Sequence, residues 1–192
     1  MTRRVAVIGA GLAGLACATA LARAGHAVTV LDNDSTLFLA TNAVTVFESA
    51  GSVTLAVNRT GFTNSDVAAA FTSSNGTAVA VADYTATSGT LSFSTGVVTL
   101  DITILLTNDQ LEEATEAFSV RLTNVTGEAS FGPETNATVT ILDNDSTLQL
   151  ASTAQTVAES VGSVTFTVTR TGFLNAAVTV PFSTVDGTAT NG

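Results

Sequence analysis

The sequence predicts a mainly β protein built around one seven-strand antiparallel sandwich at residues 36–145. Three observations support this fold class. Thr, Val and Ala dominate the 192-residue chain and only 11% of residues are charged, which suits short half-buried strands. Apolar and polar residues alternate with period two over much of the chain. A block of more than 100 residues also begins to repeat before the chain ends, which indicates a modular β architecture.

The excess of acidic over basic residues indicates which kinds of partner the chain can bind. The chain has 6 basic residues, all Arg, against 16 acidic ones, so its net charge is -10. No basic surface suited to a phosphate backbone can form from so few cations, and nucleic acid is not an expected partner. A cation is the partner that this balance favours.

The first 32 residues have the pattern of a βαβ unit. A short apolar strand at 5–8 leads into closely spaced glycines, an Ala-rich helix at 15–24 and a second strand at 27–31. In such units the glycines let a dinucleotide pyrophosphate approach the helix N-terminus, and the acid after the second strand binds a ribose hydroxyl. The unit resembles the opening of FAD- or NAD-dependent oxidoreductases. The candidate cofactor-binding residues are Gly9, Gly11, Gly14 and Asp32.

The resemblance to a dinucleotide fold ends at Asp32, because none of the further strands that complete such a fold follows it. We therefore expect residues 1–35 to be a fragment that binds neither FAD nor NAD, although an oxidoreductase fragment remains the alternative function. A second interpretation is also open. Arg3-Arg4, the uncharged stretch 5–22 and the Ala20-Leu-Ala22 triplet match a secretory signal peptide, while the glycine spacing favours the βαβ unit.

An internal repeat organises the rest of the chain. The string Val28–Leu37 recurs as Val139–Leu148, 111 positions later, and Arg59-Thr-Gly-Phe62 recurs as Arg170-Thr-Gly-Phe173 at the same offset. We therefore divide the chain into a βαβ fragment at 1–35, one whole sandwich at 36–145, and a second repeat at 146–192 that is cut off at Gly192.

Period-two patterning divides the whole sandwich into seven strands separated by turn residues. The breaks fall at Gly, Asn, Asp and Pro positions such as Asn75-Gly76 and Gly127–Pro133. The strands are predicted at 37–47, 52–59, 66–72, 90–94, 97–106, 117–124 and 136–142.

If each strand crosses the sandwich and the next one returns, the acidic residues of three connections and of the end of the last strand meet at one pole. Carboxylates gathered in this way repel one another, and a hard cation that accepts six to eight oxygens relieves the repulsion. Calcium fits a loop-built carboxylate cup better than magnesium does. The candidate metal ligands are Glu48, Asp83, Asp109, Glu113, Glu116, Asp143 and Asp145.

Four separated blocks resemble, in order and spacing, the Calx-beta motif of sodium/calcium exchangers, integrin β4 and many bacterial surface proteins. They are Glu48–Gly51, Asn75–Ala78 with Asp83-Tyr84, Asn108–Phe118 and Val139–Asp145. The resemblance implies an immunoglobulin-like sandwich that binds calcium through the seven acids, with the Leu111 carbonyl as a further ligand. Asn108 and Asn144 stand where calcium-responsive members carry Asp, so a lower affinity or one fewer ion is expected.

The function expected from this resemblance is a calcium-binding structural or adhesion module without catalytic activity, whose bound ion stiffens the junction with adjacent repeats. A surface or extracellular location follows from the family, and a cytoplasmic one follows if the βαβ interpretation holds. Glu112 is expected to be solvated, and Arg59 to cover apolar surface with its stem. The tail 146–192 is expected to leave its apolar positions without a second sheet.

Overall fold

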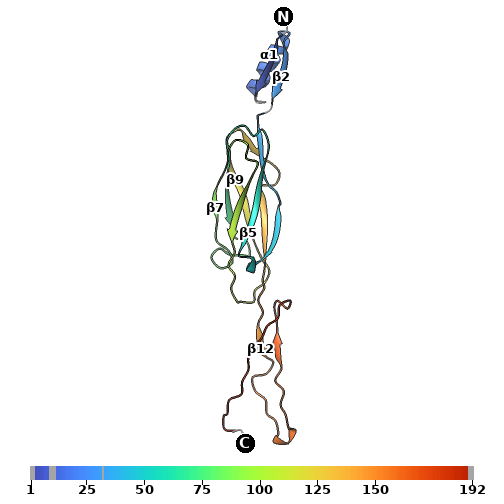
Figure 1. Cartoon of the computed structure of the whole chain (residues 1–192), viewed down its shortest axis with the longest axis vertical. Helices are drawn as coiled ribbons and strands as arrows, with labels where there is room; N and C mark the ends of the chain where they lie inside the picture. Colours follow the sequence, from blue (N-terminus) through green and yellow to red (C-terminus); the bar gives the residue numbers. More distant parts are fainter. Residues whose placement is uncertain (1–2, 9–11, 32, 190–192) are drawn as a thin grey trace. The chain divides into compact units, whose positions relative to one another are not determined.

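A computed structural model describes residues 3–8, 12–31 and 33–189 of the chain (Figure 1). Within these residues the chain forms two compact units. The first comprises Met1–Asp109 and Ala114–Asp143, and the second comprises Gln110–Glu113 and Asn144–Gly192. The connection at 110–113 therefore belongs to the second unit although the sequence on both sides of it belongs to the first.

The N-terminal segment forms the predicted βαβ unit. Strand β1 (Arg4–Ile8) pairs in parallel with β2 (Ala27–Leu31), and α1 (Leu12–Arg23) connects them. The helix ends at Arg23, and Gly25 follows with a φ of 80°, which lets the amide of His26 donate to the Leu21 carbonyl at 3.1 Å. Of the candidate cofactor-binding residues, Gly14 lies in α1, whereas Gly9, Gly11 and Asp32 lie outside the described residues.

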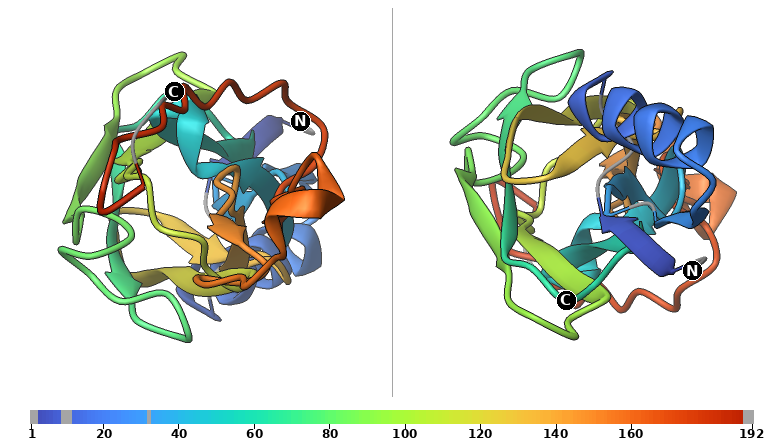
Figure 2. Two further views of the ribbon diagram at one scale, coloured as in Figure 1. Left: turned by 90° about the horizontal axis from the view of Figure 1, so that it is seen from below. Right: turned by 90° about the horizontal axis from the view of Figure 1, so that it is seen from above.

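The central segment is a sandwich of two sheets, shown end-on in Figure 2. The four-stranded sheet has the order β10-β3-β5-β8, and the five-stranded sheet has the order β4-β11-β9-β6-β7. The first contains β3 (Ser35–Leu39), β5 (Ser52–Gly61), β8 (Thr99–Leu105) and β10 (Ala129–Phe131). The second contains β4 (Ala43–Phe47), β6 (Val67–Ser74), β7 (Ser88–Phe93), β9 (Glu116–Thr126) and β11 (Asn136–Leu142).

Two features differ from the strands expected at 37–47 and from the turn expected at 127–133. The segment 37–47 is divided between the sheets, because β3 pairs antiparallel with β5 while β4 pairs parallel with β11. The chain crosses from one sheet to the other at Ala40–Asn42, where Thr41 Oγ1 donates to the Ala43 carbonyl at 2.8 Å. The expected turn contains the short strand β10, which pairs parallel with β3.

The core lies between the two sheets and follows the period-two pattern. Val53, Leu55 and Val57 of β5 face it from one sheet, and Phe118, Val120 and Leu122 of β9 face it from the other. The ring of Tyr84, 1% exposed, stacks on Phe118 with 4.0 Å between ring centroids and 8° between ring planes. This packing fixes the ends of the strands from which the acidic residues project.

Arg59 corrects the expectation that only its stem covers apolar surface, because its whole side chain is buried at the end of β5. Its guanidinium donates to Ser35 Oγ at 3.0 Å and to the carbonyls of Phe62 and Ser65 at 2.8 and 2.7 Å. These bonds satisfy a charge that would otherwise be costly to bury. Arg59 thereby ties β3 to the chain that follows β5.

The second unit repeats this arrangement of an arginine that ties two strands together. Strand β12 (Leu148–Leu150) pairs antiparallel with β13 (Val168–Arg170), and Arg170 donates to Ser146 Oγ at 3.0 Å and to the Phe173 carbonyl at 2.6 Å. A 3₁₀ turn, η2 (Glu159–Val161), lies between the strands in sequence. As expected, the large apolar side chains of this unit are exposed: Val164, Phe166, Val168, Val178, Val180 and Phe182.

Candidate metal centre

The parallel pairing of β4 with β11 brings the first two acids together. In this pair Phe47 lies opposite Leu142, so the residue that follows each strand leaves the same edge of the sheet. Those residues are Glu48, which begins the 3₁₀ turn η1 (Glu48–Ala50), and Asp143. Gly51 ends this turn with φ 72° and returns the chain into β5.

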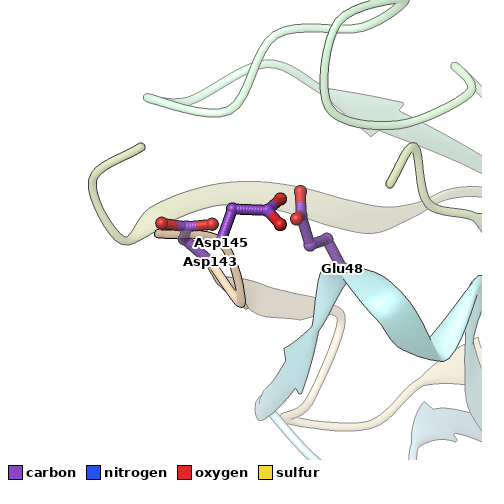
Figure 3. Close-up of side chains that lie close together, drawn as sticks. All are labelled: Glu48, Asp143 and Asp145. Carbon is purple, nitrogen blue, oxygen red and sulfur yellow. The ribbon is translucent and has the colours of Figure 1, made fainter. Parts of the chain in front are cut away.

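Glu48, Asp143 and Asp145 form a carboxylate cluster in which one oxygen from each residue lies within 4.8 Å of the other two. Glu48 is 4% exposed, whereas both aspartates are half-buried. Figure 3 shows the carboxylate of Asp145 lying between those of Glu48 and Asp143 in the view drawn. Glu48 lies 95 positions before Asp143 in the sequence, so it meets the two aspartates only through the fold.

The cluster concentrates negative charge around one buried and two half-buried carboxylates. Two unit charges about 4.8 Å apart repel by roughly 1 kcal/mol in a water-like medium and by roughly 3.5 kcal/mol at an effective dielectric of 20. The groups are hard oxygen donors, and bidentate or monodentate carboxylates are the ligands that calcium takes. The cluster therefore fits the core of a calcium site, completed by further oxygens up to the usual six to eight.

The structure does not include the other four predicted ligands in this cluster. They lie on the connections that follow β6 and β8 and at the start of β9. Glu116 begins β9 opposite Ile141 of β11, and β11 separates β9 from β4, the strand that leads into Glu48. Asp83 lies on the connection between β6 and β7, and its backbone carbonyl accepts from the Thr107 amide at 3.0 Å. Asp109 follows Leu105, the last residue of β8, by four positions, and Glu113 lies further along the β8–β9 connection.

The side chain of Asp83 has a structural partner of its own. Its Oδ2 accepts from the Val79 amide at 2.6 Å, which closes the short loop containing Val81 at a φ of 84°. A β-branched residue in this conformation is strained, so the loop must be held by its hydrogen bonds. Asp83 in this conformation stabilises its loop through Oδ2. If Asp83 also binds a metal ion, its Oδ1 is the oxygen available.

The Asn75-Gly76 block builds the base of the same connection. Asn75 Oδ1 accepts from the hydroxyl of Tyr84 at 2.7 Å and from the amide of Ala80 at 3.0 Å. A side chain on Gly76 would collide with the Ala117 carbonyl of β9, so this position requires glycine. The motif therefore orients the β6–β7 connection over the end of β9 where Glu116 begins.

Glu112 is exposed, as expected, but it has hydrogen-bond partners that the sequence did not indicate. Its Oε2 accepts from the Thr171 hydroxyl at 2.7 Å and from the Thr147 amide at 3.2 Å, instead of meeting only solvent. These hydrogen bonds, first from Thr171 and then from Thr147, lower the pKa of the Glu112 carboxyl. The repeat offset could have directed attention to it, because Thr147 and Thr171 correspond to Thr36 and Thr60.

Comparison with known proteins identifies the sandwich. The model of the Calx-beta domain family matches residues 31–145 and again residues 143–192, which is most of the chain. The chain belongs to the Calx-beta family. The two matched Calx-beta segments follow the internal repeat, the first covering the whole sandwich and the second covering the partial repeat.

Solved Calx-beta structures have the same fold. The apo-form Calx CBD1 domain superimposes with a TM-score of 0.57 at 29% identity, over 58% of this chain and 99% of that domain. CBD12 from CALX1.2 gives a TM-score of 0.57 at 27% identity, over 65% of this chain and 52% of that one. The calcium binding domain CBD12 of CALX1.1 gives 0.55 at 30% identity, over 57% of this chain and 46% of that one.

Curated relatives include sodium/calcium exchanger 1 of Canis lupus familiaris, 33% identical over 186 residues, and sodium/calcium exchanger 2 of Mus musculus, 33% identical over 179 residues. The matches cover 85% and 84% of this chain but only 19% of either exchanger. Within the part of the chain that the structure describes, no helix has the length and apolar character needed to cross a membrane.

A second family model, FAD dependent oxidoreductase, matches residues 4–45. This agrees with the resemblance of the βαβ unit. The matched segment runs past β2 into β3 and β4, which belong to the two sheets of the Calx-beta sandwich rather than to the β1–β2 sheet.

Proposed function

We propose that residues 36–145 are a calcium-binding structural module of a tandem-repeat surface or adhesion protein, and that the bound ion stiffens the pole leading into the next repeat. The observation that carries the proposal is the convergence of Glu48, Asp143 and Asp145 within 4.8 Å. Asp109, Glu113, Glu116 and Asp83 are the further ligands that we assign to the site. The module itself needs no catalytic residues for this role.

The relatives support the cation and the tandem arrangement. Sodium/calcium exchangers and the calcium binding domain CBD12 of CALX1.1 are named for calcium, and the Calx-beta model matches this chain in two consecutive segments. Asp143 and Asp145 lie between the last strand of one repeat and the first strand of the next. A cation held there would order the segment through which the repeats are connected.

We infer that residues 1–35 do not by themselves bind FAD or NAD, despite Gly9, Gly11, Gly14 and Asp32. Within the described residues the β1–β2 sheet has two strands, and the following strand, β3, pairs instead with β5 and β10. A dinucleotide fold holds the second half of its cofactor on further strands of the same sheet. The oxidoreductase alternative requires that another polypeptide supply those strands.

Isothermal titration calorimetry of the full chain with calcium, FAD and NAD in separate experiments tests both functions. We expect calcium to bind and the two dinucleotides to give no heat beyond dilution. Binding of FAD or NAD without calcium binding would replace the structural proposal with the oxidoreductase alternative.

A matched pair of variants tests the location of the calcium site. Glu48→Gln with Asp143→Asn removes two cluster charges, and Glu134→Gln with Asp101→Asn removes the same two charges from outside the cluster. We expect the first variant to lose calcium binding and the second to retain it. Equal loss in both variants would show that calcium responds to net charge rather than to this site.

A further inference from the structure

We infer that Glu112 is an inter-repeat clamp: the tip of the β8–β9 connection of one repeat binds the first β-hairpin of the repeat that follows. This role adds to the proposed calcium function and does not depend on it. The group that this hairpin binds is the carboxylate of Glu112, which the preceding Calx-beta repeat supplies.

Chain connectivity provides the first observation. Gln110–Glu113 belongs to the second unit, whereas Asp109 and Ala114 on either side belong to the first. The loop tip is therefore a part of the second unit that the first repeat contributes. If the two repeats were joined only by a linker, the second unit would contain only residues that follow Asp143.

The contacts of Glu112 provide the second observation. Its Oε2 receives the Thr171 hydroxyl at 2.7 Å and the Thr147 backbone amide at 3.2 Å. These two threonines face each other across the hairpin, where the Thr171 amide also donates to the Thr147 carbonyl at 3.0 Å. One carboxylate oxygen thus bridges both strands at the start of the second repeat.

The space for Glu112 is provided by glycine. Gly172 has a φ of 79°, and a Cβ built there would come within 2.9 Å of both Cγ and Cδ of Glu112. The carboxylate stem therefore packs directly against the backbone after Thr171. A Cβ on Gly172 would also lie 2.5 Å from the Asp145 carbonyl, as one on Gly61 would lie 2.5 Å from the Asp34 carbonyl, so the glycine serves the hairpin of each repeat as well as admitting Glu112.

The receiving surface belongs to the repeat. Thr36, Thr60 and Gly61 of the first repeat correspond to Thr147, Thr171 and Gly172, and Thr36 lies opposite Thr60 in the β3–β5 pair. Each repeat therefore has the same threonine pair and glycine at its entrance. In a tandem array, the same threonine pair could therefore bind a loop carboxylate at each junction between repeats.

Amide hydrogen exchange of the full chain, measured by NMR in the presence of a chelator, tests the clamp. Glu112→Ala should accelerate exchange of the Thr147 amide by about fivefold or more, because a charge-assisted hydrogen bond is lost. Thr171→Val should weaken protection of the same amide, and Thr171→Ser should restore it. The control variants Glu134→Ala and Thr138→Val should leave Thr147 unchanged.

Unchanged Thr147 exchange in Glu112→Ala would overturn the clamp. Equal acceleration in the control variants would overturn it as well, because the effect would then be general destabilisation. The Leu122 amide, which donates to the Thr135 carbonyl within the first repeat, reports such destabilisation internally. The proposed calcium function is tested separately by calorimetry, so the failure of either idea can be distinguished from failure of the other.

Discussion

Glu48→Gln should have opposite effects on stability with and without calcium. Glu48 is 4% exposed and shares the cluster with two other carboxylates within 4.8 Å. Removing its charge relieves roughly 1 kcal/mol or more of repulsion per neighbour and keeps the side-chain shape. A gain of about 1 kcal/mol raises Tm by about 4 °C for a domain of this size. In chelator, Glu48→Gln should therefore be more stable than the parent protein.

Calcium should reverse this order. The parent protein gains about 2.7 kcal/mol when free calcium is 100 times its Kd, because the ion binds only the folded state. Loss of one carboxylate ligand that weakens binding a hundredfold or more removes about 2.3 kcal/mol of this gain, which exceeds the roughly 2 kcal/mol of repulsion relieved from two neighbours.

Differential scanning calorimetry in chelator and in millimolar calcium measures both signs, with Glu134→Gln as the control. A fall in Tm of Glu48→Gln in chelator would refute the reasoning, since repulsion within the cluster would then not be the main effect of the Glu48 charge.

Three further outcomes are expected. Tyr84→Phe should lower the free energy of unfolding by about 1 kcal/mol in urea denaturation, because the hydroxyl that donates to Asn75 is lost; an unchanged midpoint would contradict the role of this bond. Deleting residues 147–192 should raise solubility without weakening calcium affinity, since exposed apolar side chains such as Phe182, 96% exposed, are removed. The purified 192-residue chain should show no flavin absorbance, and a yellow preparation would indicate that the βαβ unit binds FAD after all.

The alternation of apolar and polar residues, together with turn residues, predicted strands whose ends depend on neighbouring sequence. Strand β11 (Asn136–Leu142) begins and ends where the sequence predicts, because Pro133 precedes the alternating run and Asp143 follows it. The division of 37–47 into β3 and β4 was not predicted. Its crossing point, Ala40–Asn42, contains neither Gly nor Pro, and sheet membership is set by distant partners rather than by period.

The candidate site shows the same limit of local pattern. Glu48, Asp143 and Asp145 could be assigned to one pole from the order of the strands, but their close approach follows from the parallel β4–β11 pair. Glu112 is exposed, as expected, but its two hydrogen-bond partners were not predicted, and neither was the burial of Arg59. The partners of both side chains are mostly backbone groups and hydroxyls. Such partners carry no charge that would mark the pairing in the sequence.

A crystal structure of the full chain grown in calcium most directly tests the claim that this pole holds the ion. We expect density for calcium between Glu48, Asp143 and Asp145, with carboxylate oxygens at about 2.3–2.6 Å from the ion. A structure in millimolar calcium with the ion bound elsewhere, or with water among these three carboxylates, would contradict it.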